Sequence, residues 1–528
     1  MTDEHDDDSH QRVTDEHDDT YVGAIDQGTT GTRFMLFDHA GRVVSSAYER
    51  HEQQYPEPGW VEHDPIEIWE NVTAVVEGAL QTADVSPTQL EAIGVTNQRE
   101  TTVAWDADTG APVHDAIVWQ DRRTVDRIEE LEAEGKTDSI RSKTGLEPDA
   151  YFSATKVEWL LENADPIELD RSRPEDVRDR AETGDVLVGT IDSWLIYNLT
   201  GAHLTEVTNA SRTMLFDVHA LEWDDELLEE FDVPRAALPE VRPSSDEATY
   251  GTTDADGFLG CEIPVTGALG DQQAALFGQT CFDPGEVKNT YGTGSFVLVN
   301  TGSEAVESDH GLLTTVAFQR SGEPARYALE GSIFVTGAAI EWLQDVSLID
   351  DPAETADLAR RVDSTEGVYV VPAFAGLGAP HWDGRARGTI VGMTRGTRRE
   401  HLVRATLESI AYQTRDVLEA MEADAGITLS SLNVDGGAVK NVFLCQLQAD
   451  LLGTEIVRPI VDETTALGAA YAAGLAVGYW DDLEELRENW HVDRAFEPEL
   501  DEATADARYK RWHDAVECAR GWATERID

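Results

Sequence analysis

The feature that most constrains this chain is a glycine-threonine turn that occurs twice, each time between two runs of strand-forming residues. The segment at 21–38, YVGAIDQGTTGTRFMLFD, and the segment at 286–300, EVKNTYGTGSFVLVN, both predict a strand, a tight turn and a second strand. Helical patterns follow each hairpin, so each predicts the start of an α/β unit. We therefore expect two α/β halves of related design that meet near 266–270.

Three further patterns predict helices. At 401–426 apolar residues recur at spacings of three and four, and Gly426 is placed to end the helix. A similar pattern covers 66–80. The longest nearly apolar run, at 466–480, has about 15 residues, which is short of the roughly 20 that span a bilayer. We expect a tightly packed core helix there and no stable membrane insertion.

The net charge of −63, from 103 acidic and 40 basic residues, excludes some classes of partner. It disfavours binding to nucleic acid and to anionic membranes. It does not indicate a disordered chain, because 41% of the residues are hydrophobic and 13 are Trp, enough to build large cores. Only residues 1–20, in which TDEHDD occurs twice, predict a disordered acidic extension.

The charged residues also indicate the solvent in which the chain works. It is acidic and poor in Lys, yet it has the residues for a core. This combination suits a cytosol of molar salt, where charges are screened beyond about 3 Å, so we expect a halophilic, cytoplasmic protein. The absence of CxxC pairs among Cys261, Cys281, Cys445 and Cys518 favours reduced thiols, and no secretory signal is recognisable.

The first turn, DQGTTGTR at 26–33, combines groups that suit a phosphate ligand. Glycines let a ligand approach the backbone, and successive N–H groups form an anion-binding nest. The candidate phosphate ligands are Thr29, Thr30, Gly31 and Arg33, and Asp26 is placed to hold Mg²⁺ through water. A purely structural hairpin is the alternative for this segment. P-loop and Rossmann sites are disfavoured, because neither GxxxxGK[ST] nor a strand followed by GxGxxG occurs.

Two further glycine turns, YGTGS at 291–295 and VDGGAVKN at 434–441, lie in the second half. Each alone could be structural. Together with the first turn they favour a nucleotide held in a cleft between the halves.

Polar residues that could bind and activate an acceptor lie near these turns. Asp271, in GDQQAA at the junction of the halves, could accept a proton from a substrate hydroxyl or could cap the helix that follows. Arg99 and Glu100, in NQRETT, could read the hydroxyls of a polyol whose carbon face Trp119 covers. The alternative for Arg99 and Glu100 is an exposed ion pair, which contributes less than about 1 kcal/mol.

Taken in order, these motifs resemble those of the FGGY carbohydrate-kinase family, from about residue 21 to about residue 519. The motifs that carry the resemblance include DQGTTGTR, TNQRETT, IVWQDRRT, GDQQAALFGQ, NTYGTGSF and VDGGAVKN. The resemblance implies the actin–hexokinase–Hsp70 fold, with two ribonuclease-H-like α/β domains and an active-site cleft between them. It implies a glycerol- and phosphate-binding domain at 21–268 and a nucleotide-binding domain at 269–528.

TNQRETT, IVWQ and the Tyr151-Phe152-Ser153 segment look like the glycerol branch of this family. The resemblance therefore implies transfer of a phosphoryl group from ATP to glycerol, which gives sn-glycerol 3-phosphate. Its small-molecule partners would be glycerol and MgATP, and its assembly would be a homodimer. By matching positions, glycerol would contact Arg99, Glu100, Trp119, Tyr151, Asp271, Gln272 and Phe296.

The same resemblance assigns further roles. Asp271 would be the general base and Asp26 would position Mg²⁺. The ATP or ADP contacts would be Thr29, Thr30, Gly31, Arg33, Thr293, Gly337, Glu341, Gly437 and Asn441. Two positions depart from bacterial relatives. Glu341 replaces a Gln near the nucleotide, and Glu262 replaces the Arg of a Gly-Thr-Arg segment that binds the inhibitor fructose 1,6-bisphosphate. Because a carboxylate repels phosphate, we expect weak or absent inhibition by this sugar.

Two other functions compete with a glycerol-phosphorylating enzyme. A ketopentose kinase would share the fold, but Arg99-Glu100 and IVWQ argue against it. A catalytically silent sugar sensor should have lost Asp26, Asp271 or the glycine-threonine turns, and all of these are present.

Overall fold

The computed structural model describes residues 20–164 and 176–523. The disordered extension predicted at 1–20 therefore lies, apart from its last residue, outside the described residues. Within them, no helix is long and apolar enough to cross a membrane. All four cysteines are unpaired, and Cys281 and Cys445 are buried.

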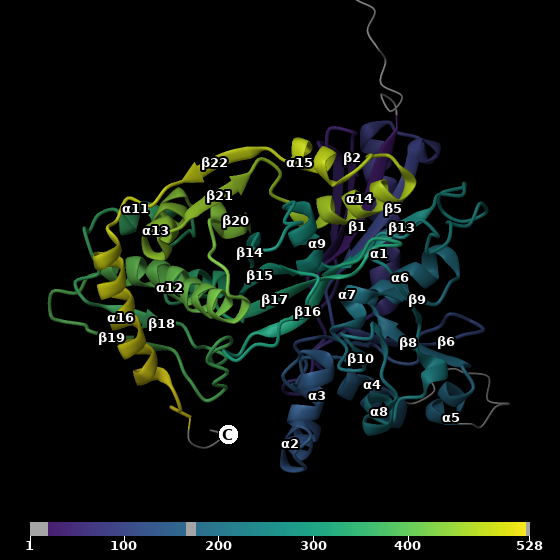
Figure 1. The fold of residues 1–528 in the computed structure, drawn as a ribbon, viewed down its shortest axis with the longest axis horizontal. Helices are drawn as coiled ribbons and strands as arrows, with labels where there is room; N and C mark the ends of the chain where they lie inside the picture. The colour runs from purple at the N-terminus through teal and green to yellow at the C-terminus, as the bar shows by residue number, and fades with distance from the viewer. Residues whose placement is uncertain (1–19, 165–175, 524–528) are drawn as a thin grey trace, which may run out of the picture.

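Two mixed β-sheets form the two halves and share a strand order (Figure 1). The first sheet runs β3 (Val43–Arg50), β2 (Gly31–Phe37), β1 (Tyr21–Gln27), β5 (Leu90–Asn97) and β13 (Val265–Gly270). The second runs β16 (Leu313–Phe318), β17 (Arg326–Ile333), β15 (Ser295–Gly302), β14 (Val287–Tyr291), β20 (Ser431–Gly436), β21 (Glu455–Pro459) and β22 (Val492–Phe496). In both sheets the strand that opens the hairpin, β1 or β14, also pairs with a parallel strand. The prediction of two related α/β halves is confirmed.

The helices that cover these sheets begin and end close to the predicted positions. Pro65 is the first residue of α1 (Pro65–Ala83), and the side chain of Asp64 caps it by accepting from the Ile66 N–H. Helix α12 (Arg399–Ala425) ends at Gly426, whose φ of 64° is the left-handed conformation that glycine favours. The other main helices are α6 (Ile191–Thr200), α9 (Asp271–Gly278), α10 (Gly337–Asp345), α13 (Val442–Leu452), α14 (Thr464–Val477), α15 (Leu483–Asn489) and α16 (Glu502–Ala519).

A smaller four-stranded sheet extends the first half: β4 (Glu62–His63), β7 (Ala116–Ile117), β6 (Thr102–Asp106) and β8 (Val186–Thr190). Helices α4 (Ala154–Asn163) and α5 (Val177–Glu182) contact this sheet. The other short helices of this part of the chain are α2 (Val125–Ala133), α3 (Thr137–Thr144), α7 (Val207–Ala210) and α8 (Asp225–Glu230). In the second half, α11 (Glu354–Ala359) and the pair β18 (Tyr369–Val371) and β19 (Thr389–Val391) lie beside α12.

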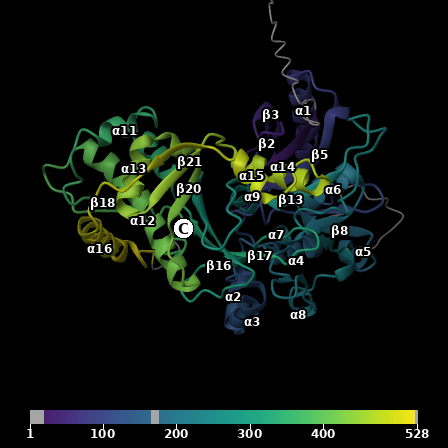
Figure 2. The ribbon, with the colours of Figure 1, turned by 45° about the horizontal axis from the view of Figure 1, so that its top comes forward.

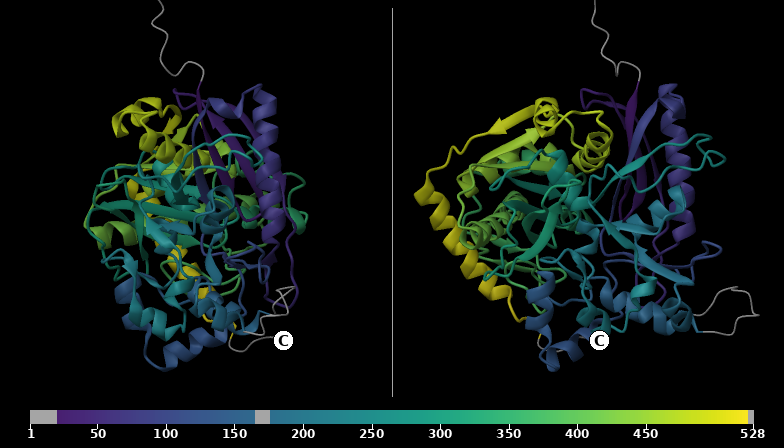
Figure 3. Two further views of the ribbon diagram at one scale, coloured as in Figure 1. Left: turned by 90° about the vertical axis from the view of Figure 1, so that its right-hand side faces the viewer. Right: turned by 45° about the vertical axis from the view of Figure 1, so that its right-hand side comes forward.

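The inner strands of the first sheet, β1, β2, β5 and β13, are buried on both faces, as their continuous apolar runs require, whereas the edge strand β3 is mostly exposed. Ile25 and Phe34 belong to the core that α1 and α6 cover, and Figure 3 shows α1 running along this outer face. Val22 and Met35, on the other face of the same strands, pack in a core with α14. Helix α14 follows a strand of the second sheet, yet it lies on the first sheet beside β1, β5 and β13 (Figure 2).

Helices α9 and α14 fill the space between the two sheets. Their core joins Leu276 and Ala470 of the helices to Val22 of the first sheet and Leu298 of the second. Strand β13 pairs with β5 through Gly270, and α9 starts at the next residue. Any side chain at the start of α9 therefore lies where the halves meet.

The contact between α14 and α9 depends on glycine. A Cβ atom at Gly468 would overlap the carbonyl oxygen of Ala274, a backbone atom that no rotamer change can move. We expect Gly468→Ala to lower the free energy of unfolding by about 2 kcal/mol, since overpacking outweighs the roughly 1 kcal/mol that Ala gains over Gly in a helix. The midpoint of denaturant unfolding in molar KCl measures the loss.

The matched control is Gly384→Ala, because a Cβ atom at Gly384 meets nothing within 4 Å. It should change stability by less than about 0.5 kcal/mol. An unchanged midpoint for Gly468→Ala would contradict the close approach of the two helices.

Candidate active site

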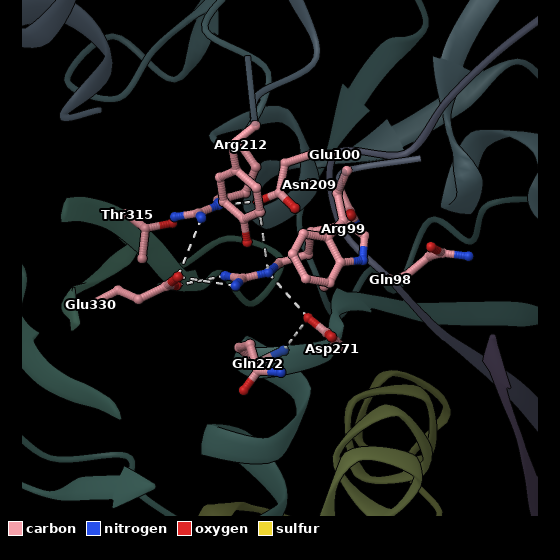
Figure 4. Close-up of polar contacts among 12 residues, drawn as sticks. Gln98, Arg99, Glu100, Asn209, Arg212, Asp271, Gln272, Thr315 and Glu330 are labelled. Carbon is pink, nitrogen blue, oxygen red and sulfur yellow. Dashed lines mark hydrogen bonds and ion pairs between the residues drawn. The ribbon is translucent and has the colours of Figure 1, made fainter. Parts of the chain in front are cut away.

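Five charged side chains meet where the turn after β5 faces the start of α9 (Figure 4). The guanidinium of Arg99 donates to both oxygens of Glu330 on β17, from Nη1 at 2.6 Å and from Nη2 at 3.0 Å. Its Nε lies 3.0 Å from Oδ1 of Asp271. Arg212, just beyond α7, donates from Nε to Oε1 of Glu100 at 2.6 Å. Opposite charges thus alternate through one network built from both halves.

Burial distinguishes this network from a surface ion pair. The side chains of Arg99 and Glu100 are 1% and 2% exposed, so the alternative of an exposed pair is wrong. Burial raises the pKa of Glu100, and the charges of Arg212 and Arg99 oppose that rise. Burial would also raise the pKa of Glu330, but Arg212 and Arg99 lower it to about 2. The two arginines therefore favour the anionic form of Glu330.

Asp271 is the member of the network that reaches the solvent, with 31% of its side chain exposed. It is the first residue of α9, and the N-cap position belongs to Gly270, so the helix-capping alternative is wrong. Its Oδ1 accepts a hydrogen bond from the Gln272 N–H at 2.7 Å. A carboxylate fixed in this way, with one face open, can accept a proton from a bound hydroxyl.

Three aromatic side chains surround the charged network. The rings of Trp119 and Tyr151 meet edge to face, with centroids 5.5 Å apart. The Phe296 ring, from β15 of the second half, lies 5.7 Å from Cζ of Arg99. Trp119 also donates from Nε1 to Oγ1 of Thr29 at 3.0 Å. This bond joins the predicted acceptor site to the predicted phosphate turn.

Gln272 is held by a buried cation, Lys288. The Lys288 ammonium donates to Oε1 of Gln272 at 2.6 Å and to Oγ1 of Thr290 at 3.0 Å. Burial lowers the pKa of Lys288 to about 8. Cζ of Arg212 lies 5.7 Å from the centroid of the Tyr151 ring, which connects the Trp119–Tyr151 pair to the network. The structure thus brings together all seven residues predicted to contact glycerol.

The backbone at Glu100 adopts an uncommon conformation, with φ of 60°. Such strain in a non-glycine residue persists where the surroundings enforce it, often at functional sites. Here Ser153 and Thr102 donate to the Glu100 carbonyl at 3.0 and 2.9 Å. The Nζ of Lys156 donates to the carbonyls of residues 150–152, which holds the segment that carries Tyr151.

In the first glycine-threonine turn, the Thr29 carbonyl accepts two side-chain hydrogen bonds. His51 and Gln53 each donate from Nε2 to the Thr29 carbonyl at 2.9 Å. The N–H groups of Thr29 and Thr30 have no hydrogen-bond partner among the residues that the structure describes. Gly31 is required sterically, because a Cβ atom there would overlap the side chain of Tyr48 and the carbonyl oxygen of Glu49. Free N–H groups on a fixed turn are suited to bind phosphate oxygens.

Arg33 and Asp26 face each other across the hairpin. Arg33 forms an ion pair with Glu463, at the N-cap of α14, a partner that the sequence did not indicate. Burial raises the pKa of Asp26 to about 7, Arg33 opposes the rise, and the nearby charges of Glu463 and Asp271 add to it.

No group of three or more His, Cys, Asp or Glu able to hold a metal occurs within residues 20–164 and 176–523. Asp26 nevertheless fits the role predicted for it. Mg²⁺ takes oxygen ligands, keeps several waters and is usually held by one or two carboxylates together with substrate phosphates. A cation beside Asp26 would also offset the carboxylates that crowd it.

Three of the predicted nucleotide residues, Thr293, Gly337 and Gly437, lie at the second turn. The N–H of Gly337 donates to the Gly292 carbonyl, and the N–H of Ala338 donates to that of Thr293, both at 3.1 Å. The next strand brings Gly436, and so Gly437, beside the same turn, because Gly436 pairs with Tyr291.

Two other predicted nucleotide contacts lie further from this turn. Glu341 is exposed one helical turn further along α10. Asn441 caps α13, since its Oδ1 accepts from the Leu444 N–H at 3.1 Å, and its Nδ2 donates to Thr355.

Comparison with known proteins assigns the chain to a family. Models of the N-terminal and C-terminal domains of the FGGY family of carbohydrate kinases match residues 21–278 and 287–477. The chain belongs to the FGGY family of carbohydrate kinases. The first match ends with α9, whereas the boundary predicted from the sequence, at 268/269, falls inside β13.

This FGGY kinase is similar to glycerol kinases over nearly its whole length. It is 74% identical to the glycerol kinase of Haloferax volcanii and 71% identical to that of Haloarcula marismortui, each over 96% of this chain and 99% of the relative. The crystal structure of Plasmodium falciparum glycerol kinase with ADP is 38% identical, with a TM-score of 0.87 over 95% of this chain and 98% of that one. Xylulose kinase from Lactobacillus acidophilus shares the fold, at 22% identity, with a TM-score of 0.82 over 94% and 97% of the chains.

Sequence reasoning about this FGGY kinase missed Arg212, Glu330, Lys156 and Lys288, which hold the predicted ligands in place. Glu330 and Lys156 are ionisable residues in largely apolar stretches, and that was the available signal for these two. Glu262, by contrast, is exposed in the segment that precedes β13, as its proposed effect on a sugar phosphate requires.

Proposed function

We propose that this chain phosphorylates glycerol with ATP to give sn-glycerol 3-phosphate, the first step in the use of glycerol as a carbon source. The observation that carries the proposal is the 70–74% identity, over 96% of the chain, to glycerol kinases of several haloarchaea. The geometry agrees with it, because Arg99, Glu100, Tyr151 and Asp271 form one polar cluster walled by Trp119 and Phe296.

The proposed chemistry assigns each group a step. The terminal hydroxyl of glycerol attacks the γ-phosphoryl group in line with the departing ADP, and Asp271 accepts the hydroxyl proton. Arg99 and Glu100 orient the other hydroxyls. Trp119 and Phe296 cover the carbon chain and exclude water, which would otherwise compete as acceptor. Phosphoryl transfer needs mostly positioning and charge stabilisation, and this site supplies both.

The nucleotide is proposed to lie between the two glycine-threonine turns. The free N–H groups of Thr29 and Thr30, the Gly31 backbone and the Arg33 guanidinium would bind its phosphates. The remaining nucleotide contacts are proposed to come from Thr293, Gly337, Glu341, Gly437 and Asn441. Asp26 would hold Mg²⁺, which when bound neutralises charge on the phosphate oxygens.

An acceptor assay in molar KCl tests this function. We expect ADP release to require glycerol and to stay at a low basal rate with D-xylulose or with no acceptor. Turnover with xylulose alone would indicate a ketopentose kinase. The absence of turnover with any acceptor, from a folded and ATP-binding chain, would indicate a silent sensor.

We also propose that the enzyme works as a halophilic, cytoplasmic protein and assembles as a homodimer. The net charge of −63 and the similarity to glycerol kinases of Haloferax and Haloarcula support the first part. The homodimer rests on the family resemblance, and sedimentation in molar KCl tests it.

A further inference from the structure

We propose that Glu330 is a positioning residue that keeps the two Nη groups of Arg99 away from Asp271, so that only Nε of the guanidinium contacts the Asp271 carboxylate, which stays free to accept the substrate proton. The proposal deepens the proposed function and rests on it. It assigns a role to a residue that never faces the cleft, since the Glu330 side chain is 0% exposed.

Both oxygens of Glu330 are committed to the two arginines of the network. Oε2 accepts from Nη1 of Arg99 at 2.6 Å, and Oε1 accepts from Nη2 at 3.0 Å, the paired geometry that arginine and carboxylate prefer. Nη2 of Arg212 also lies close to Oε1 of Glu330, at 3.2 Å. This pairing fixes the direction of the Arg99 guanidinium, because its two Nη groups can serve only one carboxylate in this way.

Only Nε of the Arg99 guanidinium is left to face Asp271. The Arg99 Nε lies 3.0 Å from Oδ1 of Asp271, and this Nε forms no hydrogen bond of good geometry to any described residue. Without the charge of Glu330, the Nη groups of Arg99 would have Asp271 and Glu100 as their neighbouring carboxylates. A carboxylate that accepts two N–H bonds from a cation is a weaker proton acceptor. By binding the Nη groups of Arg99, Glu330 therefore keeps the Asp271 carboxylate able to accept a proton.

The contact also crosses between the halves. Arg99 belongs to the turn after β5 of the first sheet, whereas Glu330 belongs to β17 of the second, 231 residues away in sequence. Figure 4 shows the two side chains meeting beside the start of α9. The acceptor site is thus completed by the half that is proposed to bind the nucleotide, so the base is correctly set only when the halves are together.

The substitution Glu330→Gln tests the proposal, because it keeps the size of the side chain and removes its charge. We expect kcat with glycerol to fall about 10²-fold, the scale that misplacement of a catalytic group produces. Glycerol-independent ATP hydrolysis and the KM for ATP should stay within about twofold of the unsubstituted protein, since the nucleotide turns are untouched. Glu330→Asp restores the charge and should recover at least about tenfold of the lost kcat.

The control is Glu408→Gln, at a buried glutamate of α12 that pairs with Arg404 outside this network. It should leave kcat with glycerol unchanged. An unaltered kcat in Glu330→Gln would overturn the proposal. So would an equal loss of glycerol-dependent turnover and basal ATP hydrolysis, which indicates a general structural role. If Glu330→Gln fails to fold, the Glu330→Asp variant decides, because a purely structural role predicts that its kcat and basal hydrolysis fall together.

These results are separable from a failure of the proposed function. The unsubstituted protein is assayed in parallel with glycerol and with D-xylulose. Activity that requires xylulose refutes glycerol as the substrate, yet the Glu330 variants still report on the base through the xylulose-dependent kcat. No acceptor-dependent activity at all refutes both proposals.

Discussion

Asp271→Asn is expected to lower kcat with glycerol by at least about 10²-fold while the KM for glycerol changes little. The amide has nearly the shape of the carboxylate and can still accept the N–H of Gln272. It cannot take up the hydroxyl proton in the transition state. The loss should therefore fall on the chemical step and not on binding.

The fold should survive this substitution for an electrostatic reason. Once Asp271 is neutral, the buried network retains two cations, Arg99 and Arg212, and two carboxylates, Glu100 and Glu330. No buried charge is left without a partner, and an unpaired buried charge is what makes such changes costly. Steady-state kinetics and a melting curve in molar KCl measure both parts of the expectation.

A matched control is Asp493→Asn, which removes a partly exposed aspartate that pairs with Arg458 on the second sheet. It should leave kcat unchanged. Near-normal turnover in Asp271→Asn would remove Asp271 from the role of base, and another group would then have to accept the proton.

Lowering the salt concentration from molar to about 0.1 M KCl is expected to cost the protein several kcal/mol of stability and most of its activity. The physical reason is the excess of 63 negative charges. In 0.1 M salt the screening length grows from about 3 Å to about 10 Å, so carboxylates on neighbouring surface positions begin to repel one another.

The active-site network should be less sensitive than the surface. Its ion pairs are buried, and buried pairs are screened much less than exposed ones. Activity should therefore fall together with the melting temperature, followed by Trp fluorescence across a KCl series, while the KM for glycerol of the remaining folded protein changes little. Full activity and an unchanged melting temperature at 0.1 M KCl would contradict a halophilic adaptation.

The sequence predicted the parts of this fold that local pattern controls. Glycine turns between β-branched runs identify the hairpins that open both sheets, and apolar spacing with Gly426 locates α12 almost to the residue. Arg99 and Glu100 could be identified as candidates because two opposite charges follow one buried strand. Only their burial distinguishes an acceptor site from a surface ion pair. That burial depends on how the other half of the molecule packs against them, which the local sequence does not show.

Long-range pairing is what the sequence could not supply. Glu330 pairs with Arg99 across 231 residues, and Arg212 pairs with Glu100 across 112. Arg33 was predicted as a phosphate ligand, but no local feature indicated Glu463 as its partner. A charged residue inside an apolar strand, as in YALEGSI, shows that a partner must exist, because an unpaired buried charge is too costly. It does not show which residue that partner is.

The close contact between α14 and α9 limits how these two helices can shift against each other. Backbone meets backbone at Gly468 and Ala274, so neither helix can move closer to the other or accept a larger residue there. The chain passes between these helices and the second sheet through short connectors. One such connector is the short link between β21 and α14, which ends at Glu463. The ion pair of Glu463 with Arg33 ties this connector to the first hairpin, so if Arg33 binds phosphate as proposed, the ligand would compete with the connector for the same guanidinium.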